Sequence, residues 1–310
     1  MQLLFLIMMF VFGAIMGSFL CCQARRLHQK FGSKSDQKSD SKTKSKTKKT
    51  TRTKSIQSRR SICLHCRHQL KWYENIPIIS WLALRGKCKK CHHKIGLLEL
   101  LSELGTALAF LLIGYKFLAG ASVIGEATEG TNVFAINLFT DFPTITPMVW
   151  GIFAATILLT LALIFLAIYD GMCGELPVLG LTISAICAII LVSLQIGNNF
   201  LVSDSPSLLE SILLPLASAL LFGGIYLILY IMSKGQWVGD GDWIVAATIG
   251  LALGRPWLSL IALFLANFSA CLVMLPAIKK QKDHHIYFGP FLVFAFIITF
   301  TFSNFLLELI

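Results

Sequence analysis

Long hydrophobic runs separated by short polar segments dominate the chain. A helix that crosses the hydrocarbon core of a bilayer needs about 20 apolar residues. The chain opens with one such run, and further long runs lie at 97–118, 147–169, 178–196, 208–232, 257–276 and 287–308. The segment from Trp243 to Leu253 is a shorter helix candidate. The pattern therefore predicts an all-α polytopic membrane protein with about eight transmembrane helices.

The first hydrophobic run has the charge pattern of an uncleaved span. Residues Met1 to Leu20 carry no charge and are followed by Arg25 and Arg26, whereas a cleavable signal peptide has its basic residues ahead of the apolar segment. We expect residues 1–23 to form the first transmembrane helix, with the N-terminus outside.

Composition and charge agree with a membrane protein. The chain is 55% hydrophobic and 14% charged, and its formal net charge is +11. Of its 27 Lys and Arg residues, 21 lie between Arg25 and Lys94. Because basic loops stay in the cytoplasm, we read this cluster as a cytoplasmic loop rather than a nucleic-acid surface, and we expect no nucleic acid as a partner.

Threading the spans from an outside N-terminus gives a consistent topology. The segments expected inside are 21–96, 170–177, 233–242 and 277–286, and those expected outside are 119–146, 197–207 and 254–256. The outside loops carry four acids and, of the basic residues, only Arg255.

The large basic loop divides into two parts. Residues 24–60 are a basic, low-complexity insertion whose Ser/Thr/Lys run from Lys34 to Lys54 cannot build a core and should stay solvated. Anionic lipid headgroups are its expected partners. Residues 61–96 are aromatic and contain four cysteines, which indicates a small folded module between the first two transmembrane helices.

The four cysteines have the spacing of a metal site. Cys63 and Cys66 form one Cys-x2-Cys pair, and Cys88 and Cys91 form a second. A reducing cytoplasm disfavours disulfides, and a module of this size needs more than a hydrophobic core. Four thiolates would close the coordination shell of a zinc ion, so we predict a zinc-ribbon-like module with structural zinc.

Two aspartates fall at the inner ends of spans, beside breaks rich in glycine. Asp170 ends one span and Asp242 begins another, directly after Gly239 and Gly241. Two close carboxylates can hydrolyse a peptide bond, because their like charges keep one protonated while the other stays ionised. The glycines would adopt backbone angles closed to other residues and let a substrate strand approach. The alternative is that each Asp only caps a helix or reaches the interface.

These residues resemble the type IV prepilin leader peptidase family of bacterial membrane aspartyl proteases. The resemblance lies in Gly239-Asp240-Gly241-Asp242, in Asp170 followed by Pro177, and in Phe288-Gly289-Pro290-Phe291. It extends to Gly17-Ser18-Phe19-Leu20 and to Trp72-Tyr73-Glu74-Asn75-Ile76-Pro77-Ile78. Val178 and Ile244 depart from the residues usual in the family.

The resemblance implies a function and a location. It makes residues 97–310 a transmembrane aspartyl peptidase core with Asp170 and Asp242 as catalytic residues. The substrates would be prepilins or pseudopilins of type IV pili and type II secretion, and the protein would reside in the bacterial cytoplasmic membrane. The resemblance further implies N-methylation of the new N-terminus with S-adenosylmethionine. Glu103 resembles a glutamate of the family's corresponding span, and we associate it with the methyltransferase activity.

Two other classes of function are open to the same residues. Paired intramembrane acids also mark ion paths, so an ion-coupled transporter that binds a cation at the two aspartates is one alternative. A zinc-bearing membrane scaffold without catalysis, in which the glycines are only turn residues, is the other.

Overall fold

The computed structural model describes residues 2–39, 63, 65–66, 69–122, 147–202, 209–235, 238–278 and 287–309. Within these ranges the regular structure is helical, apart from an isolated antiparallel bridge between Lys87 and Lys94. The long helices are α1 (Gln2–Ser39), α3 (Leu97–Ser122), α4 (Pro147–Cys173), α5 (Val178–Val202), α6 (Leu214–Ser233) and α8 (Pro256–Ile278). The shorter elements are α2 (Ile79–Ala83), α7 (Asp242–Leu253), α9 (Gly289–Thr301), α10 (Ser303–Glu308), a 3-10 turn at Trp72–Asn75 and a π-helical turn at Leu209–Leu213.

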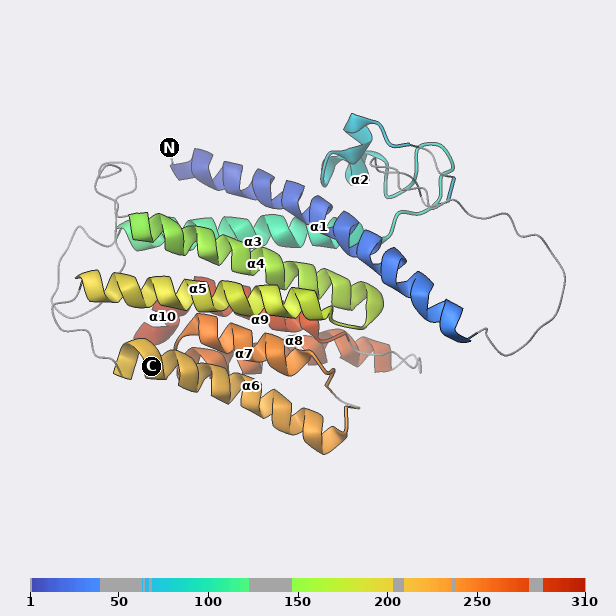
Figure 1. Ribbon diagram of the computed structural model, residues 1–310. Coiled ribbons are helices and arrows are strands. Elements are labelled where there is room, and N and C mark those ends of the chain that lie inside the picture. Colours follow the sequence, from blue (N-terminus) through green and yellow to red (C-terminus); the bar gives the residue numbers. More distant parts are fainter. Residues whose placement is uncertain are drawn as a thin grey trace. The chain divides into compact units, whose positions relative to one another are not determined.

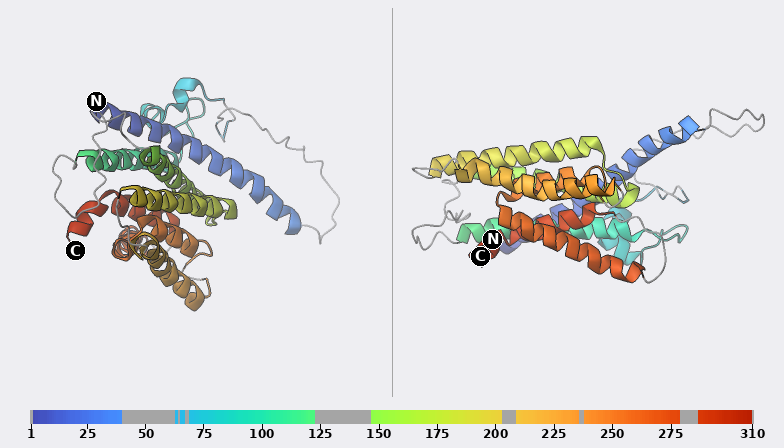
Figure 2. Two further views of the ribbon diagram at one scale, coloured as in Figure 1. Left: turned by 60° about the vertical axis from the view of Figure 1, so that its left-hand side comes forward. Right: turned by 90° about the horizontal axis from the view of Figure 1, so that it is seen from below.

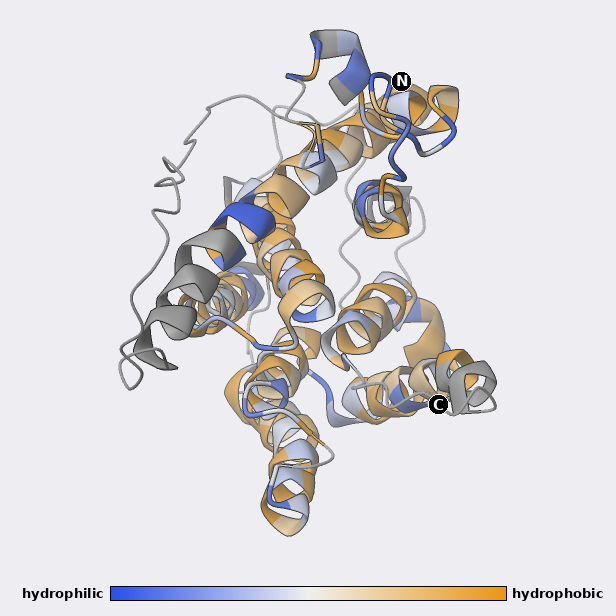
Figure 3. Cartoon of the chain, turned by 90° about the vertical axis from the view of Figure 1, so that its right-hand side faces the viewer, coloured by the Kyte–Doolittle hydropathy of each residue, from blue (hydrophilic) through white to orange (hydrophobic). Residues whose placement is uncertain are grey.

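The apolar segments that the sequence predicted as spans are helical (Figure 3). Six described helices are long and apolar enough to cross a membrane, which confirms a multi-pass membrane protein. Helices α7 and α9 are apolar but have 12 and 13 residues. At about 1.5 Å per residue they are shorter than a hydrocarbon core of about 30 Å. The eight expected spans are therefore six full-length helices and two short ones.

Helix α1 extends well beyond residue 23, where the first transmembrane helix was predicted to end. Its backbone continues without a break to Ser39, so the first part of the expected low-complexity insertion is helical. Residues 23–30 contain good helix formers and neither Gly nor Pro. This helical tendency was overlooked because the Lys- and Ser-rich run that follows has the composition of a low-complexity segment. Residues 40–60 lie outside the described residues.

The chain divides into two compact units, of which the larger comprises Met1–Val11 and Leu108–Ile310. In this unit α4 packs against α5, α6 packs closely against α7, and α4 packs against α9. Helix α7 also contacts α5, α8 and α9, so this 12-residue helix lies among longer ones (Figures 1 and 2). Its Val245 and Ile249 are fully buried.

Small residues allow the close contact between α6 and α7. A Cβ atom at Gly223 would lie 2.6 Å from the Ala247 Cβ, and one at Gly250 would lie 2.6 Å from the Ser218 carbonyl oxygen. The Ser218 hydroxyl donates to the Gly250 carbonyl at 2.7 Å. Close backbone approach through small residues and hydroxyl bonds is the usual mode of helix association in lipid.

The second unit comprises Phe12–Ala107 and contains the cysteine module. Gly17 of α1 contacts α3 so closely that a Cβ atom there would lie 2.7 Å from the Ser102 carbonyl oxygen. Arg25 and Glu99 form an ion pair between the same two helices. The first and third helices are thus fixed to each other within this unit.

Candidate functional site: a buried pair of aspartates

Asp170 lies in the last turn of α4, where Gly174 ends the helix. Gly174 has φ +68° and donates its N–H to the Asp170 carbonyl at 2.8 Å, the left-handed turn that terminates many helices. The Asp170 side chain is buried, and its Oδ2 accepts the N–H of Gly289 at 2.9 Å. Gly289 begins α9, so this bond fixes the carboxylate between two helices far apart in sequence.

Asp242 is the first residue of α7, a helical position that favours a negative charge because of the helix dipole. The side chain is 5% exposed, and its Oδ2 accepts the N–H of Gly239 at 3.0 Å. The loop of Gly239 to Gly241 thus folds back onto the carboxylate that follows it.

The two carboxylates occupy the same region of the larger unit. The charge of Asp170 acts on Asp242, and the helices that carry them belong to one packed group with α9. Each carboxylate has one oxygen held by a backbone N–H. Two buried carboxylates that influence each other in this way could share one proton.

The glycines of this loop act through close packing rather than through special backbone angles. Neither Gly239 nor Gly241 has a positive φ, and Gly241 has ordinary helical angles, so the expected use of angles closed to other residues was wrong. A Cβ atom at Gly241 would lie 2.7 Å from the Leu176 Cδ1. Its lack of a side chain lets the loop approach the segment that follows Asp170.

Asp240 and Gly289 complete the surroundings of the pair. Asp240 is exposed and bonds to the Tyr230 side chain. Gly289 was not recognised as a site residue from the sequence. A Cβ atom there would lie 2.8 Å from the Asp170 Oδ2, so the position requires glycine. The only sequence signal for this residue was the Gly-Pro pair at the start of a helix.

The four predicted cysteines converge in the second unit. The Sγ atoms of Cys63, Cys66, Cys88 and Cys91 all lie within 4.8 Å of one another. The separation is 3.9 Å between Cys63 and Cys91 and 4.0 Å between Cys66 and Cys88. Thiolates bound tetrahedrally to zinc at about 2.3 Å lie about 3.8 Å apart, so this set of donors fits a zinc ion.

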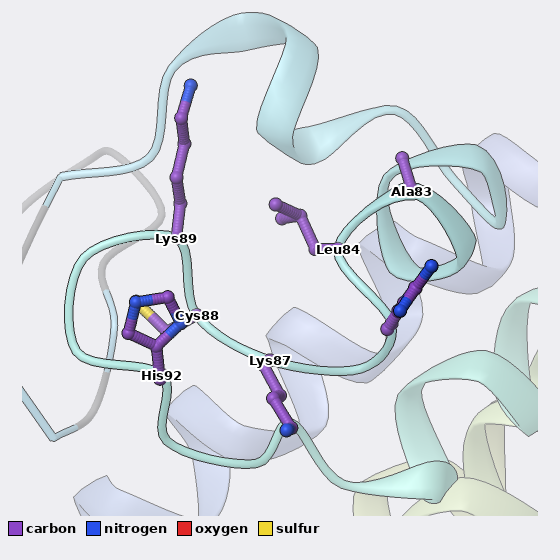
Figure 4. Close-up of a pocket in the computed structure, with 7 residues that line it drawn as sticks. Ala83, Leu84, Lys87, Cys88, Lys89 and His92 are labelled. Atoms are coloured by element: carbon purple, nitrogen blue, oxygen red, sulfur yellow. The ribbon is translucent and has the colours of Figure 1, made fainter.

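The loop around Cys88 has the features of a metal-binding turn. The Cys88 N–H bonds to the His93 carbonyl, and the His92 N–H bonds to the Cys88 carbonyl, both at 2.9 Å. Backbone N–H groups of Cys91 and Lys90 donate to the Cys88 sulfur and lower the pKa of this thiol to about 6. A shallow basic pocket of about 290 Å³ borders this loop and is lined by Lys87, Lys89 and His92 among others (Figure 4).

Glu103 makes a specific contact in the second unit. Its Oε2 accepts the Ile78 N–H at 2.7 Å, and it also bonds to the Ser18 side chain. Ile78 has φ +62° and ψ −52°, and the Ile79 N–H bonds to the Pro77 carbonyl. This is a γ-turn with its central residue in a strained region, a conformation that costs on the order of 1–3 kcal/mol. The half-buried carboxylate therefore holds a strained turn.

Comparison with known proteins agrees with these features. Residues 11–117 match the family model described as the bacterial peptidase A24 N-terminal domain. The prepilin leader peptidase/N-methyltransferase of Aeromonas hydrophila is 28% identical over 240 residues, which is 76% of this chain and 69% of that protein. The chain is therefore similar to a prepilin leader peptidase over most of its length.

Other prepilin leader peptidases match over shorter regions. The prepilin leader peptidase/N-methyltransferase of Myxococcus xanthus is 38% identical over 114 residues, which cover 37% of this chain and 27% of the relative. The Vibrio cholerae protein of the same name is 30% identical over 115 residues, which cover 37% of this chain and 38% of the relative. No solved structure matches the chain.

Proposed function

We propose that this chain is a membrane aspartyl endopeptidase that cleaves the basic leader from type IV prepilins or pseudopilins. The observation that carries the proposal is the pair of buried carboxylates, each fixed by a backbone N–H from a glycine. Similarity to relatives that are named for prepilin processing supports the choice of substrate. The site would work at the cytoplasmic face of a bacterial cytoplasmic membrane.

Asp170 and Asp242 would divide the roles of a general base and a general acid. The ionised member takes a proton from water, whose oxygen attacks the carbonyl carbon of the scissile peptide bond. The protonated member donates to the carbonyl oxygen as that oxygen gains charge. The amine then leaves with a proton from the dyad. The N–H of Gly239 and that of Gly289 would keep both carboxylates oriented while charge moves between them.

Burial of the dyad suits this chemistry. Both side chains are at most 6% exposed, so a substrate in this space meets carboxylates whose electrostatic interactions are strong because little water screens them. Asp242 stands at a helix N-terminus, which lowers the cost of keeping a charge there.

The cysteine module would hold a structural zinc ion through Cys63, Cys66, Cys88 and Cys91. Bound zinc would cross-link the two cysteine pairs, and four sulfur ligands leave no position for a reacting water. Its contribution would be the shape of the segment that joins α1 to α3.

A second activity, N-methylation of the new N-terminus from S-adenosylmethionine, would belong to the unit that contains Glu103. The carboxylate that holds the γ-turn at Ile78 is the motivating feature, since strained turns concentrate at functional sites. We expect Glu103→Gln to leave cleavage intact and to lower methylation. The mass of the product distinguishes cleavage from methylation. Methylation by Glu103→Gln at the wild-type level would show that Glu103 has no part in the methyltransferase activity.

The family match disfavours both an ion-coupled transporter and a scaffold without catalysis. The test of the proposed function is cleavage by the purified full-length protein in lipid vesicles. With a prepilin substrate, a product whose mass corresponds to the chain without its leader would support it. No cleavage of any prepilin or pseudopilin supplied would overturn it.

A further inference from the structure

Tyr226 of α6 is a fully buried side chain whose ring packs against Phe288, at the start of α9. It is 2% exposed, and its ring lies 5.4 Å from that of Phe288, centre to centre. Phe288 directly precedes Gly289, the residue that holds Asp170. The charge of Asp242 acts on the phenol. The side chain therefore packs against the segment whose Gly289 N–H binds the Asp170 carboxylate.

The hydrogen bonds of Asn267 fix the direction of the Tyr226 hydroxyl. The Asn267 Nδ2 lies 2.8 Å from the Leu263 carbonyl oxygen and 3.1 Å from the Tyr226 Oη. A carbonyl oxygen can only accept, so this side of the amide must be its NH2 group. The Tyr226 oxygen is then the acceptor of the second bond, and its own proton stays free to be donated.

That proton has no acceptor among the hydrogen bonds of the described residues. Buried donors are normally paired, and a buried donor without an acceptor costs about 1–3 kcal/mol. Phe222 and Phe288 pack against the ring and offer the hydroxyl no oxygen. The unused donor points to an acceptor that arrives with the substrate.

We propose that Tyr226 is a further catalytic residue, which donates a hydrogen bond to the carbonyl oxygen of the scissile peptide bond. This inference rests on the proposed peptidase function. When water attacks, the carbon–oxygen π electrons move to that oxygen, and the phenol stabilises the charge without giving up its proton. A donor fixed in advance and shielded from water is the arrangement that most lowers such a barrier.

The test is Tyr226→Phe, which keeps the ring and removes only the hydroxyl. Tyr115→Phe is the matched control, since Tyr115 lies on α3 with 51% of its surface exposed. We expect Tyr226→Phe to lower kcat on the order of a hundredfold, with KM and thermal stability close to those of the wild-type protein. Tyr115→Phe should match the wild type.

An unchanged kcat in Tyr226→Phe, or a loss explained by KM or by lower thermal stability, would overturn the inference. If Tyr226→Phe does not fold, Asn267→Leu provides the test, because this change removes the amide that orients the Tyr226 hydroxyl. We expect a smaller fall in kcat at constant KM in that variant, and an unchanged kcat would overturn the inference. Failure of the wild-type protein to cleave would instead overturn the proposed function, and this inference with it.

Discussion

At the scale of single residues, each carboxylate of the aspartate pair accepts one glycine N–H, from Gly289 for Asp170 and from Gly239 for Asp242. Asp170 and Asp242 could be selected because they adjoin breaks in hydrophobic runs. The partner of Asp170 could not be, because the N–H of Gly289 lies 119 positions further along the chain and reaches the carboxylate only through the packing of α9 on α4. Nothing in the sequence singled out Tyr226, because an aromatic residue within a span looks like ordinary packing.

We expect Gly289→Ala to impair the site directly. The new methyl group would lie 2.8 Å from the Asp170 Oδ2 and 3.2 Å from its Cβ, so the carboxylate must move away from the N–H that holds it. A misplacement of about 1 Å can cost about a hundredfold in rate, and we expect a loss of at least about tenfold in the rate of prepilin cleavage.

Gly224→Ala is the control for this substitution. Gly224 lies on α6, and a Cβ atom there would meet nothing within 4 Å. We expect the control variant to cleave at the wild-type rate in the same vesicle assay. Wild-type activity in Gly289→Ala would show that the Asp170 carboxylate does not depend on this contact.

At the scale of elements, the cysteine module was the part best predicted from local sequence. Two Cys-x2-Cys pairs need only a short loop between them to converge, so their spacing indicated the cluster before the fold was known. The γ-turn at Ile78 left no such signal. It follows from a carboxylate on α3, a contact that no local pattern encodes.

We expect Cys88→Ser to remove bound zinc from the purified protein and to expose the segment 63–96 to proteolysis. Losing one of four thiolates opens the coordination shell, and the module is too small to keep its shape through a core alone. Zinc content by elemental analysis and the pattern of limited proteolysis measure the two effects.

Cys271→Ser is the matched control, since Cys271 is exposed on α8 and is not part of the cluster. We expect it to keep wild-type zinc content. Equal zinc in Cys88→Ser and in the wild-type protein would contradict a four-cysteine zinc site.

At the scale of the whole molecule, hydropathy predicted the helical segments correctly but not the lengths of all of them. The first transmembrane helix was predicted to span residues 1–23, although the backbone of α1 is helical to Ser39. The length of α7 depends instead on its neighbours. A helix of 12 residues is stable within the protein because α5, α6, α8 and α9 contact it, so it need not match the bilayer by itself.

We expect α7 to cross from the cytoplasmic side to the outside despite its length. Reporter fusions that end after Lys234 and after Gly254 bracket this helix. A reporter that is active only in the cytoplasm should be active when fused after Lys234. A reporter that is active only outside the cytoplasm should be active when fused after Gly254. The same reporter working at both positions would contradict the topology and would separate α7 from the transmembrane helices.

The most direct test of the central claim is the rate of prepilin cleavage by Asp170→Asn and Asp242→Asn in lipid vesicles. Asparagine keeps the shape of the side chain but cannot exchange the proton, so we expect each variant to lose at least about a hundredfold in rate. Asp240→Asn, the same change at the exposed acid of the loop, should retain most of the activity. Cleavage at the wild-type rate by either Asp170→Asn or Asp242→Asn would contradict the catalytic pair.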